Sequence, residues 1–254
     1  MIGHINEEIF NYDIKRFHKF HSDLGFIKDR ITESLGDLYG MHWPYKQHKT
    51  SRNVKKLPYH NELKNFGACF GVSAGYERPM WFALDGEKAE YEYSYNYQNW
   101  YPSVEYETNN TISNVGLYDL SPFSKFEIIS EKAHEDLQRI CTSNIKQEPG
   151  KCNYTHMLNK DGGIETDLTV VCIDQNHFRI ISSAATRERD KFHIKKHLSE
   201  GVELIDVTED YCVFGIFGPK SRLLMQDLSS DDFSNENFKF ANSKYIEIDG
   251  TKIW

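Results

Sequence analysis

The second half of the sequence alternates between strand-like and helix-like segments, and no other feature constrains the fold as strongly. Short apolar runs predict strands at residues 126–129, 166–173, 178–181, 202–207 and 212–217. Helical patterns follow Ser130, which can act as an N-cap, and Gly218-Pro219, and a charged helical pattern covers residues 187–198. Strands separated by helices and short turns predict an α+β fold, with a mixed sheet and flanking helices over residues 115–254.

Two turn signals lie in this half of the sequence. Asp174-Gln175-Asn176 separates two strand-like runs, and Asp249-Gly250 follows the apolar run 245–248. Asp-Gly after such a run is a strong hairpin signal. The second arm of that hairpin has begun when the sequence stops at Trp254. Because natural proteins usually avoid an unpaired strand edge, we expect the sequence to be a truncated piece of a longer protein.

The first 114 residues are less regular. Residues 6–38 are predicted to be helical, because apolar side chains recur there at three- and four-residue spacing (Ile14, Phe17, Phe20, Leu24 and Ile27). Residues 57–82, which hold several glycines, are predicted to be irregular. Residues 87–114, which are rich in Tyr, Asn and Glu, are predicted to be an irregular but ordered connection between two units. We expect the apolar helix face to pack on a domain outside this sequence, so the isolated chain would self-associate or be poorly soluble.

Composition excludes several classes of protein. The sequence has no run of about 18 apolar residues, which argues against a membrane-spanning helix, and its first residues lack the apolar core of a secretory signal. Thirty Lys and Arg residues against 38 Asp and Glu residues give a net charge of −8, so a nucleic-acid partner has no electrostatic support. The five cysteines are widely spaced without a CxxC pair, which indicates a reducing compartment and neither a zinc site nor a disulfide framework.

The most informative window runs from residue 152 to residue 170. Gly162 and Gly163 lie just before a strand, where the backbone can turn tightly or allow close approach of another group. Asp167 lies at the start of that apolar strand, where carboxylates are depleted. It is either a carboxylate that faces a pocket and accepts a proton, or an ordinary edge or turn residue. The pattern alone favours the ordinary residue.

Other chemistry-bearing residues give weaker signals. Five histidines, His18, His21, His42, His48 and His60, invite a metal site, but none lies in an HExxH or HxxEH frame. Ser121 lacks the frame of a nucleophile elbow, which excludes a serine hydrolase of that type. Cys69, within a Gly-Ala-Cys-Phe-Gly segment, is interpreted as a small buried residue and not as a nucleophile. No metal is expected.

Longer stretches of the sequence resemble the sarcosine and dimethylglycine dehydrogenase family, with the sarcosine enzymes closest. Residues 13–34 resemble the end of the family's FAD-dependent amine-oxidase domain. Two further stretches, 66–70 and 75–82, resemble its middle region. Residues 118–126, 154–170 and 217–222 look like the folate domain that the family shares with the aminomethyltransferase of glycine cleavage. The resemblance implies an oxidase-domain tail at 1–40, a middle connecting domain at 41–114 and the incomplete N-terminal part of the folate domain at 115–254.

Members of this family oxidise an N-methyl amine at FAD and pass the resulting one-carbon unit to tetrahydrofolate, giving methylene-tetrahydrofolate. By resemblance, Asp167 matches the carboxylate near N10 of the folate and is the implied catalytic residue. The implied folate-binding residues are Tyr154, Asn159, Gly162, Gly163 and Ser183. The FAD-binding domain lies outside this sequence and is the implied partner, and a further folate-gripping glutamate would follow Trp254, so the folate site would be partial. Such a protein would be cytoplasmic in a bacterium and would lie in the mitochondrial matrix in a eukaryote.

Two alternatives remain open. A non-catalytic homologue, like the regulatory subunit of pyruvate dehydrogenase phosphatase, would keep this architecture to bind protein partners. A stand-alone folate-dependent aminomethyltransferase is the second alternative, although such an enzyme has no use for the oxidase-like segment at 13–34. Titration with folate separates the regulatory homologue from the enzymes.

Overall fold

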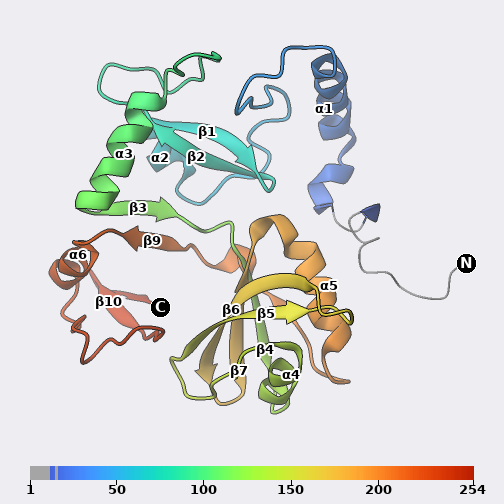
Figure 1. Cartoon of the computed structure of the whole chain (residues 1–254), viewed down its shortest axis with the longest axis vertical. Helices are drawn as coiled ribbons and strands as arrows, with labels where there is room; N and C mark the ends of the chain where they lie inside the picture. Colours follow the sequence, from blue (N-terminus) through green and yellow to red (C-terminus); the bar gives the residue numbers. More distant parts are fainter. Residues whose placement is uncertain (1–11, 15–16) are drawn as a thin grey trace, which may run out of the picture. The chain divides into compact units, whose positions relative to one another are not determined.

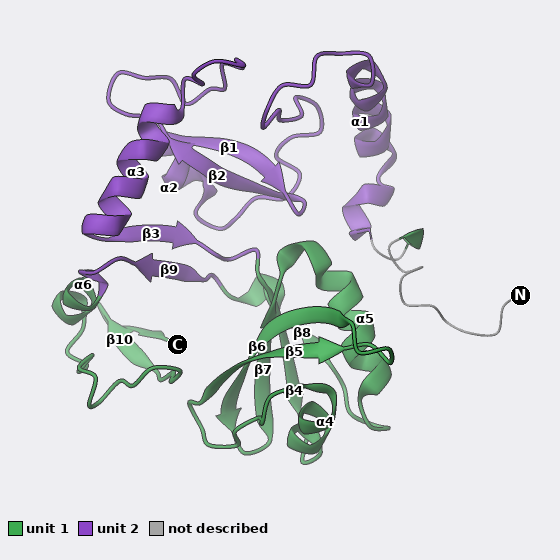
Figure 2. Cartoon of the chain, in the orientation of Figure 1, with its two compact units in different colours: residues 1–16, 123–211, 222–254 green, residues 17–122, 212–221 purple. Residues whose placement is uncertain are grey.

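The computed structural model describes residues 12–14 and 17–254, and it divides into two compact units (Figures 1 and 2). Among the described residues, the first unit holds residues 12–14, 123–211 and 222–254, and the second holds residues 17–122 and 212–221. Within the described residues, no helix combines the length and the apolar character that crossing a bilayer requires.

A five-stranded antiparallel sheet forms the centre of the first unit. Its strands lie in the order β5 (Cys152–Leu158), β6 (Ile164–Asp174), β7 (His177–Ser182), β4 (Ser124–Ile129) and β8 (Ile205–Asp206). The strands predicted at 126–129, 166–173 and 178–181 are confirmed, whereas only two residues of the predicted strand 202–207 pair. The α+β fold is confirmed, but every strand pair in this sheet is antiparallel where a mixed sheet was expected.

Helices α4 (Ala133–Ile140) and α5 (Arg187–His197) share a hydrophobic core with this sheet. Every second residue of β6 points into that core, which is why Leu168, Val170 and Cys172 are buried. From the helices, Ala133, Leu137 and Ile194 are fully buried in the same core. Helix α4 begins at Ala133, later than expected, so Ser130 is not its N-cap residue. The Ser130 side chain accepts a hydrogen bond from the Lys132 backbone N–H in the turn before the helix.

The rest of the first unit consists of short elements. Two 3₁₀ turns, η4 (Ala184–Thr186) and η5 (Thr208–Asp210), flank α5 and β8, and α6 (Ser221–Leu228) follows the second unit's last strand. Strands β10 (Ile246–Ile248) and β11 (Thr251–Ile253) form the predicted hairpin. Asp249 and Gly250 both have positive φ angles, 48° and 72°, as the favoured two-residue hairpin turn requires.

The second unit contains two two-stranded sheets and three α-helices. A hairpin of β1 (Ala68–Ser73) and β2 (Tyr76–Phe82) follows α2 (His60–Asn65), so the expectation that residues 57–82 are irregular was wrong. Helix α3 (Tyr101–Ser113) likewise corrects the second half of the irregular segment predicted at 87–114. Strands β3 (Gly116–Asp119) and β9 (Phe214–Phe217) pair antiparallel. The core of this unit includes Cys69, Trp81 and Trp100, and Cys69 is only 3% exposed, which confirms it as a buried residue. Burial raises the pKa of its thiol to about 11.

The first helix is shorter than its sequence pattern predicts. After a 3₁₀ turn, η3 (Lys19–Ser22), α1 covers Leu24–Asp37, and the Asp23 side chain caps it by accepting the Phe26 N–H at 2.8 Å. Phe17 and Phe20 therefore precede the helix, while the expectation for residues 6–11, 15 and 16 lies outside the described residues. No residue of α1 is buried, and its exposed apolar side chains are Leu24, Ile31 and Leu35.

Candidate functional site

The hairpin of β5 and β6 brings the two most informative residues onto one face of the sheet. Thr166 and Leu168 are buried, so the alternation of the strand leaves Asp167 on the opposite, exposed face. Asp167 pairs directly with His156, and Tyr154 pairs with Thr169 two residues away. Side chains of directly paired residues lie on the same face of an antiparallel sheet. The face opposite α4 and α5 therefore carries Tyr154, His156 and Asp167 together.

Tyr154 and Asp167 form a hydrogen-bonded pair. The Tyr154 hydroxyl donates to Oδ2 of Asp167 at 3.0 Å, and this contact with the carboxylate raises the pKa of Tyr154. The Tyr154 ring meets the His156 ring edge-on, with 5.6 Å between the centroids. The hydrogen bond fixes one oxygen of the carboxylate, and Asp167 remains exposed, so its other oxygen can reach a ligand.

The turn between β5 and β6 is built by Asn159. Its side-chain oxygen accepts the backbone N–H groups of Asp161 at 3.0 Å and Gly163 at 2.8 Å. Gly162 has a φ of 83°, which favours glycine, and a Cβ on Gly163 would come within 2.9 Å of the Asn159 amide nitrogen. Asn159, Gly162 and Gly163 are thus explained as parts of a tight turn, which holds the start of β6.

Ser183 lies one residue beyond the end of β7. Leu168 pairs with Ser182, so continuing that register places Ser183 alongside Asp167 on the neighbouring strand. The Ser183 side chain accepts the Ala185 N–H at 3.3 Å, and its carbonyl accepts the Ser124 hydroxyl at 3.1 Å. These contacts fix the backbone that follows β7.

His156 is the residue of this face that sequence reasoning missed. The signal was available, because positions 154 and 156 of a strand share a face with each other, and a strand over 152–158 could have been predicted from the apolar and β-branched residues there. The glycine pair Gly162-Gly163 indicates the strand that follows it, and His156 lies on the strand before it.

The same face carries a buried ion pair further along the sheet. Arg179 and Glu127 pair directly across β7 and β4, with 2.7 Å between Nη2 and Oε1, and the Arg179 guanidinium lies over the Tyr211 ring at 4.2 Å. His177 Nε2 lies 3.0 Å from the second carboxylate oxygen of Glu127. Breaking such a buried pair costs several kcal/mol, so this end of the face is a rigid platform.

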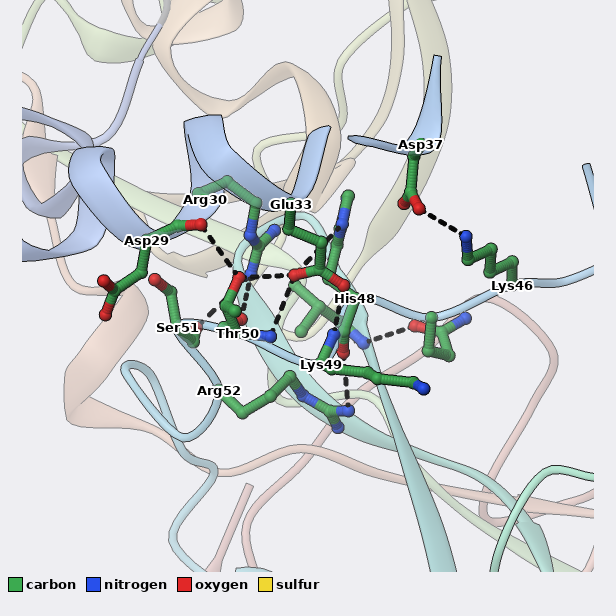
Figure 3. Close-up of polar contacts among 12 residues, drawn as sticks. Asp29, Arg30, Glu33, Asp37, Lys46, His48, Lys49, Thr50, Ser51 and Arg52 are labelled. Atoms are coloured by element: carbon green, nitrogen blue, oxygen red, sulfur yellow. Dashed lines mark hydrogen bonds and ion pairs between the residues drawn. The ribbon is translucent and has the colours of Figure 1, made fainter. Parts of the chain in front are cut away.

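In the second unit, Glu33, Asp37 and His48 are the described residues that could together hold a metal ion. One ligand atom from each lies within 4.8 Å of the others. Figure 3 shows that both carboxylates already have protein partners: Glu33 accepts the N–H groups of Lys49 and Thr50 and the Thr50 hydroxyl, and Asp37 lies 2.5 Å from Lys46 Nζ. A metal ion would compete with these contacts, so we interpret the cluster as a clamp between α1 and residues 46–52.

A pocket of about 310 Å³ adjoins this clamp. It is lined by Ser34, Asp37, Leu38, His42, Trp43, Lys46, Gln47 and His48. Asp167 and Tyr154 belong to the other unit and do not line it.

The clamp gives a pH-dependent prediction for Glu33. Burial opposes ionisation of its carboxyl, but the hydrogen bonds from Thr50 and Lys49 outweigh burial and lower its pKa from the usual 4.5 to about 2. A lowered pKa contributes stability that is present above pH 4.5 and is lost as the pH falls toward 2. Glu33→Gln should therefore destabilise this unit at pH 7 by roughly 1.5–3 kcal/mol, the contribution of hydrogen bonds to a charged group.

Thermal unfolding at several pH values checks this prediction. The wild type and Glu33→Gln should differ at pH 7 and converge toward pH 2. Asp29→Asn, on an exposed position of the same helix, is the control and should change little at any pH. If Glu33→Gln is less stable than the wild type by the same amount at pH 7 and at pH 2, the charge of the carboxylate has no part in the clamp.

Comparisons with known proteins agree with the fold. The model of the GCVT N-terminal domain matches residues 59–254, and the model of the FAD dependent oxidoreductase central domain matches residues 3–56. The crystal structure of the glycine cleavage system aminomethyltransferase T from Bartonella henselae superposes with a TM-score of 0.57 at 21% identity, over 69% of this chain and 44% of that one. At that identity the superposition shows a shared fold.

Curated relatives are longer than this chain. It is 35% identical over 237 residues to 4-methylaminobutanoate oxidase (formaldehyde-forming) of Paenarthrobacter nicotinovorans, covering 93% of this chain and 29% of the relative. It is 27% identical over 289 residues to the mitochondrial sarcosine dehydrogenase of Homo sapiens, covering 98% of this chain and 32% of that relative. It is also 27% identical over 258 residues to the mitochondrial pyruvate dehydrogenase phosphatase regulatory subunit of Mus musculus. That alignment covers 97% of this chain and 29% of the relative. The chain thus spans less than a third of the length of these relatives.

Proposed function

Because this chain belongs to the GCVT N-terminal domain family, we propose that it is the folate-binding part of an FAD-dependent N-methyl amine dehydrogenase. In this proposal it captures the one-carbon unit released from a sarcosine- or dimethylglycine-type amine as methylene-tetrahydrofolate. The relatives named as an oxidase and a dehydrogenase of such amines support the reaction class.

The hydrogen bond between Tyr154 and Asp167 carries the proposal. When a one-carbon unit becomes bonded to a folate amine nitrogen, that nitrogen gives up a proton, and a carboxylate placed beside it can accept the proton. Tyr154 holds one carboxylate oxygen of Asp167 and leaves the other for the amine. The residues present fit a reduced folate in kind: a carboxylate for an N–H donor, an exposed aromatic ring for stacking on the planar pyrimidine ring of the pterin, and glycines at the turn.

The remaining candidates have supporting roles in the proposal. Asn159, Gly162 and Gly163 form the turn that sets the start of β6 and lets a ligand approach the backbone closely. Ser183 presents the end of β7 beside Asp167. All of these residues would contact tetrahydrofolate or shape the backbone around it.

FAD would be held by a domain outside residues 115–254. We propose residues 1–40 as the tail of that oxidase domain and residues 41–114 as a connecting domain, and the match of residues 3–56 to an FAD dependent oxidoreductase central domain supports the oxidase part. The exposed apolar side chains of α1 would then pack on the flavin domain. When bound there, FAD would supply oxidation of the amine, and this chain's residues would act on the product.

A regulatory role is the second candidate, since one relative is a phosphatase regulatory subunit. Such a protein could keep the fold without binding folate. The hydrogen-bonded Tyr154–Asp167 pair favours the enzyme, because a surface used only for protein contacts has no need of a preorganised carboxylate. The match at residues 3–56 counts against a stand-alone aminomethyltransferase.

Calorimetric titration of the full-length protein with tetrahydrofolate tests the proposal. The wild type should bind, and Tyr154→Phe, which removes only the hydroxyl, should bind about tenfold more weakly because a hydrogen bond to a charged group is lost. Tyr97→Phe, at an exposed tyrosine of the other unit, is the control and should match the wild type. Absence of binding by the wild type would favour the regulatory role, and equal affinities for wild type and Tyr154→Phe would remove Tyr154 from the site.

A further inference from the structure

His156 shares the outer face of β5 and β6 with Tyr154 and Asp167, and the proposed reaction gives it no role. The carbonyl of His156 accepts the Thr142 N–H at 2.9 Å, so the backbone polar groups of His156 point toward residue 142 and away from β6. His156 and Asp167 therefore form a cross-strand pair of the closer, non-hydrogen-bonded kind, with Cα atoms about 4.5 Å apart. Their side chains stand next to each other on the outer face.

Both edges of β5 are fixed, which sets the direction in which the His156 side chain leaves the strand. One edge pairs with β6 from Cys152 to Leu158. The other edge is held by Ser143, whose N–H donates to Oγ1 of Thr155 at 3.0 Å and whose hydroxyl donates to the Tyr154 carbonyl at 3.3 Å. The backbone that carries Tyr154 and His156 is thus supported on either side.

The imidazole ring of His156 is held by a contact that leaves its nitrogens unused. The ring packs edge-on against Tyr154, with an angle of 69° between the two planes. A histidine beside a carboxylate can form an ion pair, but here the Tyr154 hydroxyl binds Oδ2 of Asp167. Among the residues that the structure describes, neither ring nitrogen of His156 has a hydrogen-bond or ion-pair partner. Because the residue is only half-buried, a ligand on this face can reach the ring.

We propose that His156 is a binding residue for tetrahydrofolate, and that one of its ring nitrogens donates a hydrogen bond to an oxygen acceptor of the folate while Asp167 faces the folate amine. The inference rests on the proposed function of this face. The two side chains offer complementary groups side by side, because a carboxylate only accepts hydrogen bonds and an imidazole N–H donates one. Reduced folate carries both counterparts: its amine nitrogens are donors, and its carbonyl and carboxylate oxygens are acceptors.

His156→Phe in the full-length protein is the central variant, because it keeps a ring for the edge-on contact with Tyr154 and removes both nitrogens. Loss of one hydrogen bond should weaken tetrahydrofolate binding about three- to tenfold. A contact made equally in the bound state and in the transition state changes KM and leaves kcat unchanged. We therefore expect Kd and KM for tetrahydrofolate to rise by that factor, with kcat and flavin reduction within about twofold of the wild type.

Two amide variants separate the nitrogens from the ring. His156→Asn and His156→Gln lack the ring and place an amide N–H near the positions of Nδ1 and Nε2, so at least one of them should bind tetrahydrofolate more tightly than His156→Phe. If His156→Phe does not fold, His156→Ala takes its place as the variant without a donor. Calorimetry gives the Kd of each variant, and thermal unfolding shows that each is folded.

His134→Phe is the matched control. His134 is a half-buried histidine of α4 in the same unit, its ring stacks on Phe178, and its Nε2 lies 2.8 Å from the Ile145 carbonyl. It belongs to the helix that shares the core with the opposite face of the sheet. His134→Phe should therefore change stability and leave the Kd for tetrahydrofolate as in the wild type.

Tetrahydropteroate, which lacks the glutamate of folate, identifies the acceptor. If His156→Phe weakens the binding of tetrahydropteroate and tetrahydrofolate alike, the acceptor lies in the pteroyl part of the molecule. If the weakening is confined to tetrahydrofolate, the acceptor is a carboxylate of the glutamate. Either result supports the contact.

Two results would overturn it. One is equal affinity of the wild type and His156→Phe for tetrahydrofolate, and the other is that both amide variants bind no more tightly than the variant without a donor. Both results leave the proposed function intact, because they concern only the ring nitrogens of His156. Failure of the wild type to bind tetrahydrofolate would instead overturn the proposed function and this inference together.

Discussion

Asp167→Asn in the full-length protein is expected to lower the rate of methylene-tetrahydrofolate formation by about 10²–10⁴-fold while leaving flavin reduction by the amine unchanged. Asn has nearly the shape of Asp and can still accept the Tyr154 hydroxyl, so the fold and the pair geometry should persist. It cannot accept a proton, because its amide is not basic. The rate of proton removal from the folate amine is the quantity that falls.

Single-turnover measurements separate the two steps. Flavin bleaching reports oxidation of the amine, and trapping of methylene-tetrahydrofolate against free formaldehyde reports carbon capture. Asp161→Asn, an exposed carboxyl in the adjacent turn, is the control and should leave both steps intact. Equal loss of both steps in Asp167→Asn would contradict the role assigned to Asp167, since it would indicate damage that reaches the oxidation itself.

The largest expected effect on stability comes from Phe178→Ala in β7. Phe178 is completely buried in the core between the sheet and α4. Truncating a buried phenylalanine leaves a cavity and costs about 3–5 kcal/mol, because neighbouring side chains relax only partly. Urea unfolding followed by a probe in this unit should show a correspondingly lower midpoint.

Phe240→Ala provides the control for that measurement. Phe240 lies in the same unit and is fully exposed, so its truncation in this chain should change stability by no more than about 0.5 kcal/mol. A Phe178→Ala variant as stable as Phe240→Ala would mean that the core around β7 is not packed as described.

Sequence patterns found the strands where alternation is simple and failed where a contact decides the structure. Residues 57–82 read as irregular because Gly71 and Pro79 weaken a strand pattern. In the structure a Cβ on Gly71 would come within 2.8 Å of Gln47 and Met80, so glycine allows close packing there, and Pro79 lies opposite Phe70 at an irregularity of the ladder. Gly71 in β1 and Pro79 in β2 thus belong to a hairpin that packs closely and has an irregular ladder.

Helix α3 was missed for a related reason. Its sequence is rich in Asn, Thr and β-branched residues, which have low helix propensity. A tertiary contact supports it, since Glu107 accepts the Phe82 N–H at 2.7 Å, and no local pattern reveals that contact. Pro102 in the first turn was a usable local signal of the helix start.

The candidate site was accessible to sequence reasoning only in part. The pattern around Gly162 and Gly163 pointed to Asp167 weakly, and the family resemblance supplied Tyr154. Their hydrogen bond depends on the pairing of β5 with β6, which places residues 13 positions apart on one face.

The most direct test of the central claim is a crystal structure of the full-length protein with tetrahydrofolate bound. The account predicts a folate nitrogen within about 2.6–3.2 Å of an Asp167 carboxylate oxygen, with the Tyr154 hydroxyl still donating to the other oxygen. Folate bound elsewhere, with Asp167 facing only solvent, would contradict it.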